Sequence, residues 1–90
     1  MLERRVTVIN DLGLHARAAA QVVRTARRFT SQVTLTNVNT GECANAKSIL
    51  TLLHLAAGIG VTITLTAEGD DESDAIAAIE ALFLNGFGEM

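Results

Sequence analysis

The sequence has no proline, no tryptophan and no tyrosine, and it contains a single cysteine. Phenylalanine is the only aromatic residue type, although hydrophobic residues make up 49% of the chain. The core is therefore expected to be built from Ala, Val, Ile and Leu, with the three phenylalanines as its largest pieces. Because 90 residues supply only one such core, we expect one domain over residues 1–90.

The scarcity of cysteine and histidine limits the chemistry that the chain can carry. Cys43 has no second thiol for a disulfide or a thiolate cluster, and we expect it to be a buried, inert thiol. His54 has no acid or cysteine at a ligand spacing, and two distant histidines with one cysteine do not converge as metal ligands, so no metal site is expected. The sequence also lacks a glycine-rich phosphate loop and a serine nucleophile signature, so we expect no nucleotide cofactor and no Ser-His-acid triad.

Long apolar runs are missing too, and none approaches the roughly eighteen residues that span a bilayer. The polar start is unlike a signal peptide, so we expect a cytoplasmic protein without membrane insertion. A net charge of -3 and the missing aromatic platform argue against nucleic-acid binding. Four of the seven basic residues nevertheless fall within residues 17–28, whereas seven of the ten acids fall within residues 68–89. Such a local basic surface favours docking of acidic protein partners.

Hydrophobic periodicity predicts seven elements in the order β-α-β-β-α-β-α. Alternating apolar residues predict strands, and helical spacing of apolar residues predicts helices. The expected strands are residues 3–9, 32–38, 42–44 and 61–67, and the expected helices are residues 16–29, 49–58 and 70–84. This order predicts an α+β fold, with an antiparallel sheet covered by helices on one face.

The second expected helix is apolar on nearly every side. Ser48 precedes it and is well placed as its N-cap. A two-turn helix in so small a protein cannot bury every side chain, so Ile49, Leu50 and Leu53 belong either to the core or to an exposed contact patch. The residues alone leave both options open.

His15 stands where a glycine turn meets the first helix, two residues before Arg17. There the free amides of Ala16, Arg17 and Ala18 and the positive end of the helix dipole stabilise an anion. The same field disfavours a protonated imidazole and keeps the ring nucleophilic, so a phosphoryl group on it would be held by these amides and Arg17. From these residues alone, a capping or surface histidine remains the alternative, and His54 receives no role.

Three segments, residues 12–17, 45–50 and 67–72, occur in an order and at a spacing that resemble the HPr family of bacterial phosphotransferase systems. The resemblance runs from about Arg5 to Leu84. It implies an open-faced β-sandwich of four antiparallel strands and three helices, in agreement with the element order. It also implies a phosphoryl carrier and not an enzyme, with no cofactor and an expected monomeric state.

The resemblance further implies roles for individual residues. His15 would receive phosphate on Nδ1 from phosphorylated enzyme I, which phosphoenolpyruvate charges, and would pass it to a sugar-specific IIA protein. Arg17 matches an arginine that helps to hold the phosphoryl group. The partner-docking surface would contain two arginines of the first helix and three apolar residues of the second: Arg24, Arg27, Ile49, Leu50 and Leu53.

Two positions carry additional expectations. Ser48 matches a serine that a dedicated kinase phosphorylates in some bacteria, and the alternative is that it only caps the helix. Ala18 replaces the proline that usually follows the arginine, which restores an amide and frees the unfolded chain. We expect a looser phosphoacceptor turn, a loss of about 0.4–1 kcal/mol in stability and intact transfer.

Two other functions compete with a carrier in sugar uptake. The first keeps the His15 chemistry in a regulatory or nitrogen-type branch of the phosphotransferase system. The second is a non-catalytic α/β binding module on a similar β-α-β layout.

Overall fold

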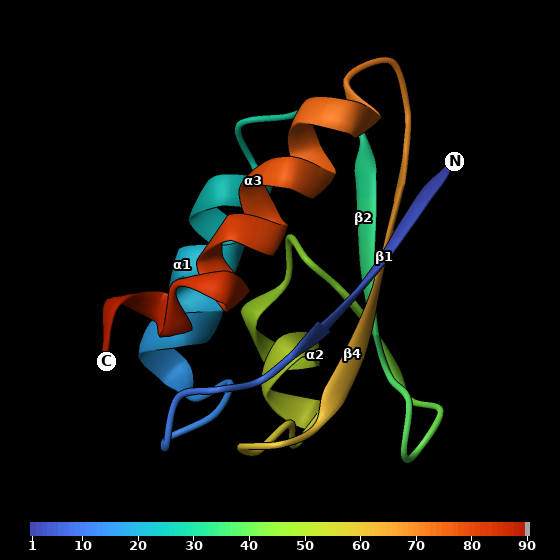
Figure 1. Ribbon diagram of the computed structural model, residues 1–90. Helices are drawn as coiled ribbons and strands as arrows, with labels where there is room; N and C mark the ends of the chain where they lie inside the picture. Colours follow the sequence, from blue (N-terminus) through green and yellow to red (C-terminus); the bar gives the residue numbers. More distant parts are fainter. Residues whose placement is uncertain (90) are drawn as a thin grey trace.

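The computed structural model describes residues 1–89 and shows four strands in one antiparallel sheet (Figure 1). The strand order across the sheet is β1-β4-β2-β3. The strands are β1 (Leu2–Thr7), β2 (Gln32–Asn37), β3 (Cys43–Asn45) and β4 (Thr62–Glu68). The two edge strands are thus β1 and β3. β4, the last strand in the sequence, lies between β1 and β2.

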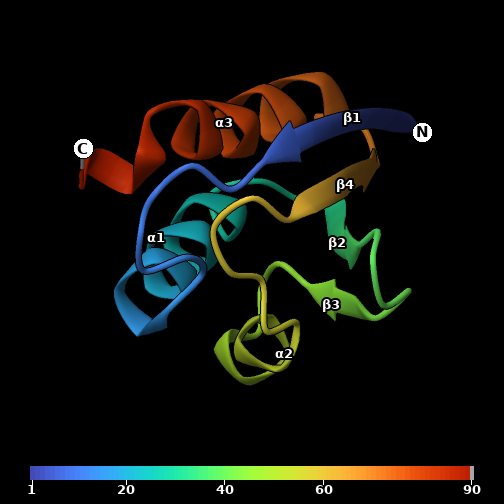
Figure 2. The same ribbon diagram turned by 60° about the horizontal axis from the view of Figure 1, so that its bottom comes forward.

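Three α-helices cover one face of this sheet, which leaves the other face open (Figures 1 and 2). They are α1 (Ala16–Ala26), α2 (Ile49–His54) and α3 (Glu72–Leu84), and a short 3-10 helix, η1 (Gly86–Gly88), follows. The expected α+β open-faced sandwich and its element order are therefore confirmed, with η1 as an unpredicted addition. No helix in residues 1–89 is long and apolar enough to cross a membrane.

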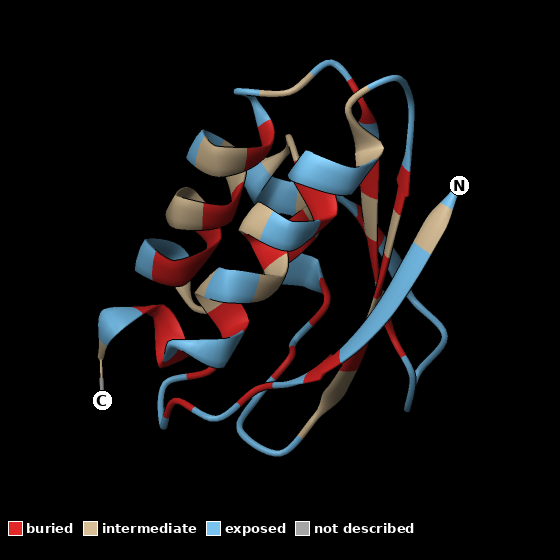
Figure 3. Cartoon of the chain, turned by 45° about the horizontal axis from the view of Figure 1, so that its top comes forward, coloured by how far each residue is buried: buried red, intermediate tan, exposed pale blue. Residues whose placement is uncertain are grey.

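The core forms where alternating strand residues meet the helices (Figure 3). Leu35 of β2 pairs with Leu65 of β4, and both are fully buried. Burial of each such leucine contributes about 1.5–3 kcal/mol to folding. The threonines between the inward-facing residues of β4 are only half-buried, since alternate side chains point to the open face. On the helix side the core is closed by Val22 of α1 and by Ile79 and Phe83 of α3.

Cys43 is exposed, so the expectation of a buried thiol was wrong. The register of the β2–β3 hairpin explains the error: Ala44 pairs with the buried Leu35, whereas Cys43 pairs with Thr36. Because neighbouring strand residues point to opposite faces, an inward Ala44 directs Cys43 outward. Hydrophobic character alone could not choose between these two registers.

All three helices are shorter than predicted: α3 begins at Glu72 instead of residue 70, and the other two end early. α1 ends at Ala26 instead of residue 29, because Arg28 and Phe29 donate amide hydrogen bonds to Thr25 and Ala26 in tighter turns. α2 ends at His54 instead of residue 58, and Ala56 then adopts a left-handed φ of 50°. The apolar pattern continued past both ends because the following residues still pack on the core.

A carboxylate joins the start of α3 to the start of β2. The Asp71 side chain accepts hydrogen bonds from the amides of Thr30 and Ser31, each 2.9 Å long, and from the Ser31 hydroxyl. The Ser31 hydroxyl and then the Thr30 amide are the main causes that lower the pKa of Asp71 from its ordinary 3.8 to about 2. Asp71 thereby connects residues that are 40 positions apart.

This connection predicts an acid-sensitive contribution to stability. Because the pKa of Asp71 is lower in the folded state, its carboxylate stabilises the fold above the ordinary value of 3.8. That contribution is lost as the pH falls from there to about 2. Chemical unfolding of Asp71→Asn should show a smaller free energy of unfolding at neutral pH and a weaker decline in this acid range than the parent. Asp70→Asn, at an exposed neighbouring position, should behave like the parent.

Candidate functional site

His15 is the N-cap residue of α1, with extended backbone angles of φ -79° and ψ -176°. The first bond of the helix runs from the Ala19 amide to the His15 carbonyl, at 2.8 Å. The amides of residues 16–18 therefore precede the hydrogen-bonded ladder, as an anion-binding helix start requires. Ala16 and Arg17 are exposed, whereas Ala18 is fully buried.

A glycine turn fixes the chain just before His15. Gly13 has a φ of 66°, and its amide donates to the Asn10 carbonyl at 3.1 Å. The next amide, of Leu14, donates to the Ala57 carbonyl at 2.9 Å. A Cβ atom on Gly13 would lie only 2.5 Å from that same carbonyl oxygen, so glycine is required both for the backbone angle and for the close approach. The turn is thus held against the loop that precedes β4.

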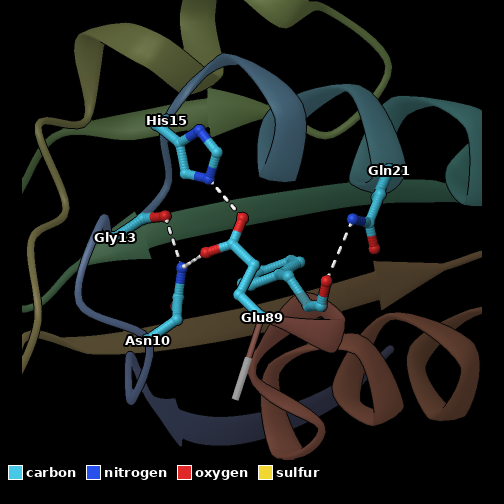
Figure 4. Close-up of polar contacts among 6 residues, drawn as sticks. Asn10, Gly13, His15, Gln21 and Glu89 are labelled. Carbon is cyan, nitrogen blue, oxygen red and sulfur yellow. Dashed lines mark hydrogen bonds and ion pairs between the residues drawn. The ribbon is translucent and has the colours of Figure 1, made fainter.

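The imidazole of His15 contacts a carboxylate from the other end of the chain (Figure 4). Its Nε2 atom lies 2.5 Å from Oε2 of Glu89. The second oxygen of Glu89 accepts a hydrogen bond of 2.9 Å from the buried Asn10 amide, which also donates to the Gly13 carbonyl at 2.8 Å. Figure 4 shows the other ring nitrogen pointing away from the carboxylate. Within residues 1–89, Nδ1 has no hydrogen-bond partner.

The segment after α3 is fastened to the body of the protein at two points. Phe87 is buried and packs edge-to-face against Phe83, with ring centroids 4.9 Å apart. Its carbonyl accepts a hydrogen bond of 3.1 Å from the Gln21 side chain of α1. These contacts hold Glu89 beside the histidine.

No sequence pattern pointed to Glu89, Asn10 or Gln21 as residues of this site. The two glycines Gly86 and Gly88 were the only sequence signal for a turn after α3. In the structure Gly86, Phe87 and Gly88 all have left-handed φ angles, which let the chain turn back towards α1. Nothing in the sequence indicates which surface such a turn would meet, so the contact with His15 could not be predicted.

Charge at the site is more balanced than the sequence suggested. The hydrogen bond from Asn10, and then that from His15, lowers the pKa of Glu89, with a smaller contribution from the charge of Arg17. Glu89 is therefore ionised at neutral pH, and its negative charge opposes the positive helix field at the imidazole. Arg17 is exposed and lines, together with Asp11, Gln21 and Glu89, a cavity of about 690 Å³.

The apolar residues of α2 form an exposed patch beside the basic side of α1. Ile49, Leu50 and Leu53 are exposed by 39%, 70% and 38%, so the alternative that all three belong to the core was wrong. Ile49 also lines a groove of about 380 Å³ together with Arg24 and Arg27. The groove thus brings together three of the predicted docking residues, and Leu50 and Leu53 are exposed on the same short helix as Ile49. We call the five residues the α1–α2 face: Arg24, Arg27, Ile49, Leu50 and Leu53.

Ser48 occupies the N-cap position of α2, as predicted, but its hydroxyl makes no capping hydrogen bond. The side chain is half-buried at the margin of the α1–α2 face. His54, at the end of the same helix, is exposed.

A family model described as "PTS HPr component phosphorylation site" matches residues 2–85. The chain belongs to the HPr family. HPr proteins are phosphocarriers of the bacterial phosphotransferase system that are transiently phosphorylated on histidine, not catalysts of a reaction of their own. The resemblance inferred from three sequence segments is thereby confirmed.

Individual relatives extend over nearly the whole chain. Phosphocarrier protein HPr of Cupriavidus necator is 49% identical over 89 residues, which cover 99% of this chain and 98% of that protein. Phosphocarrier protein NPr of Shewanella violacea is 46% identical, with 98% and 94% covered. The HPr structure from Thermoanaerobacter tengcongensis has a TM-score of 0.92 and 42% identity, with 100% of this chain and 99% of that chain covered.

The glycine turn predicts a strong dependence of stability on residue 13. Gly13→Ala should lower the free energy of unfolding by about 2 kcal/mol or more, since it adds left-handed strain and a clash with Ala57. Gly58→Ala is the control, because nothing lies within 4 Å of the added carbon, and it should change stability by no more than about 0.5 kcal/mol. Equal stability of the two variants in urea unfolding would contradict the proposed constraint.

Proposed function

We propose that His15 accepts a phosphoryl group on Nδ1 from phosphorylated enzyme I and donates it to sugar-specific IIA proteins during carbohydrate uptake. The observation that carries this proposal is the position of the imidazole at the start of α1, with Nε2 engaged by Glu89 and Nδ1 without a partner in residues 1–89. In this proposal the carrier acts as a cytoplasmic monomer, without a cofactor or a metal.

The chemistry requires an unprotonated ring nitrogen and a place for the incoming charge. The Nδ1 lone pair attacks phosphorus, the new N–P bond forms, and the electron pair of the broken bond stays on the donor atom that leaves phosphorus. The phosphoryl dianion is then stabilised by the free amides of residues 16–18 and by the exposed Arg17.

The α1–α2 face is proposed as the surface that both partners contact. Its exposed leucines supply apolar area, while Arg24 and Arg27 add positive charge that attracts acidic partners. Arg17 and Arg24 belong to the same helix, which connects the face to His15. A partner that docks on α1 and α2 therefore brings its own reactive group towards the start of α1.

Ser48 is proposed as a site of regulatory phosphorylation. Its hydroxyl is not used in capping, and a phosphate there would add negative charge beside Ile49 and Leu50. That charge would weaken docking of acidic, apolar partners. An acid-stable phosphate that appears with a serine kinase and is absent from Ser48→Ala would identify this modification separately from that of His15.

A regulatory or nitrogen-type carrier is the second candidate function. It is favoured by the 46% identity to a protein named NPr. The chemistry of His15 is the same in both candidates, and only the acceptor differs. Offering the phosphorylated chain a sugar-specific IIA protein and a regulatory IIA protein in competition, and measuring which accepts phosphate faster, distinguishes the two.

The decisive test of the carrier function is phosphorylation of the isolated protein. With enzyme I and phosphoenolpyruvate, the chain should acquire an acid-labile, alkali-stable phosphate that His15→Ala lacks. His54→Ala removes the other histidine, which is exposed on α2, and should be labelled like the parent. Labelling that persists in His15→Ala would refute the proposal, and no labelling of the parent would favour a binding module.

Docking on the α1–α2 face predicts a second set of effects. Arg24→Glu and Leu50→Glu should each raise the KM of enzyme I for this carrier about tenfold. The physical reason is that losing a contact at the centre of an interface costs about 1 kcal/mol or more of binding free energy. Leu84→Glu is a matched control, because Leu84 is exposed by 68% on α3, compared with 70% for Leu50. A similar KM for the Leu50 and Leu84 variants would contradict the assignment of this face.

A further inference from the structure

We propose that Glu89 is a positioning residue that keeps the imidazole proton of His15 on Nε2, so that Nδ1 presents its lone pair to phosphorus. This inference rests on the proposed carrier function of His15 and assigns a role to the segment that follows α3. Glu89 does not touch the transferred group in this arrangement, since it acts through the histidine ring.

In the hydrogen bond between Nε2 and the Glu89 carboxylate, Nε2 is the donor. An ionised carboxylate has no hydrogen to donate, so a bond to it requires a hydrogen on Nε2. A neutral imidazole with a hydrogen on Nε2 has an unprotonated Nδ1. The contact of 2.5 Å therefore selects the tautomer in which Nδ1 is the nucleophile.

Glu89 is itself held in place by buried and packed groups. Asn10, only 1% exposed, donates one amide hydrogen bond to Glu89 and another to the Gly13 carbonyl. Phe87 fixes the preceding backbone through Phe83 and Gln21. The Glu89 side chain is exposed by only 13%, so water competes little for its oxygens. A carboxylate fixed in this way orients an imidazole at little additional entropic cost.

Four groups surround the ring: the start of α1, Arg17, Glu89 and Asp11. The start of α1 opposes positive charge on the imidazole, and Arg17 and Glu89 bear opposite charges beside it. Asp11 lines the same cavity as Arg17 and Glu89. Of these groups, Glu89 alone forms a hydrogen bond with the imidazole within the described residues 1–89.

The same proton location serves both halves of the carrier cycle. When His15 accepts, the N–P bond forms at Nδ1 while the hydrogen remains on Nε2, and the ring gains positive charge that Glu89 stabilises. When His15 donates, the N–P bond breaks, its electron pair returns to Nδ1, and a neutral imidazole leaves with its Nε2 hydrogen still bound to Glu89. No proton has to be exchanged with water in either step. The comparable role of a buried aspartate in hydrolases is to fix the tautomer and to stabilise the imidazolium that forms.

Glu89→Gln tests the proposal without deleting the side chain. Nitrogen NMR of the free protein at a pH where the ring is neutral should show Nε2 protonated in the parent and a mixture of both tautomers in the variant. The rate constant for phosphorylation by saturating phosphorylated enzyme I should fall about tenfold, since a hydrogen bond to a charged group is lost. The KM of enzyme I for the variant should equal that for the parent, because Glu89 lies outside the α1–α2 face. Glu89→Asp, which retains the charge on a shorter side chain, should recover part of the tautomer preference.

Glu68→Gln is the control for loss of a negative charge, because Glu68 ends β4 and pairs with Gln32 in the sheet. It should leave the tautomer and the rate unchanged. An unchanged tautomer in Glu89→Gln, with the native fold retained, would overturn the positioning role. That outcome is distinguishable from failure of the proposed function, because the tautomer is measured without enzyme I and the parent would still be labelled on His15.

Discussion

The aliphatic layer between the sheet and the helices is the constraint on which the rest of the structure depends. Without proline, tryptophan or tyrosine, the chain fills this layer mainly with aliphatic side chains, and α1 itself faces the core through the small residues alanine and valine. Small residues bring the helix close to the sheet and leave few alternative packings. The position of α1 is thereby fixed, and with it the point in space where its first amides are free.

The fixed start of α1 provides the functional site with free backbone amides and with a defined position for His15. Backbone amides at the start of α1 can stabilise an anion, and the Gly13 turn delivers His15 to the same point through its contact with Ala57. The segment after α3 then adds a carboxylate on the other side of the ring. The imidazole therefore has the free amides of a helix start on one side and a fixed hydrogen-bonding carboxylate on the other.

Much of the fold could be predicted because its elements follow strong periodic patterns. The alternation around Leu65 and the helical spacing around Ile79 each indicate one buried face, and the order of elements then leaves few topologies. The errors occurred where the pattern was short or local. The hairpin strand that contains Cys43 has only three residues, too few to fix its register, and the ends of α1 and α2 depend on turns that hydrophobicity does not encode.

The sequence by itself determined the family, the sheet with helices on one face, and the candidacy of His15 and Arg17, because these depend on local motifs and on their order. Only the tertiary structure decided that Leu50 is exposed and that Glu89 contacts His15. A contact across 74 positions depends on where packed elements bring the chain back together. That arrangement results from the shape of the whole core, and no local pattern of residues specifies it.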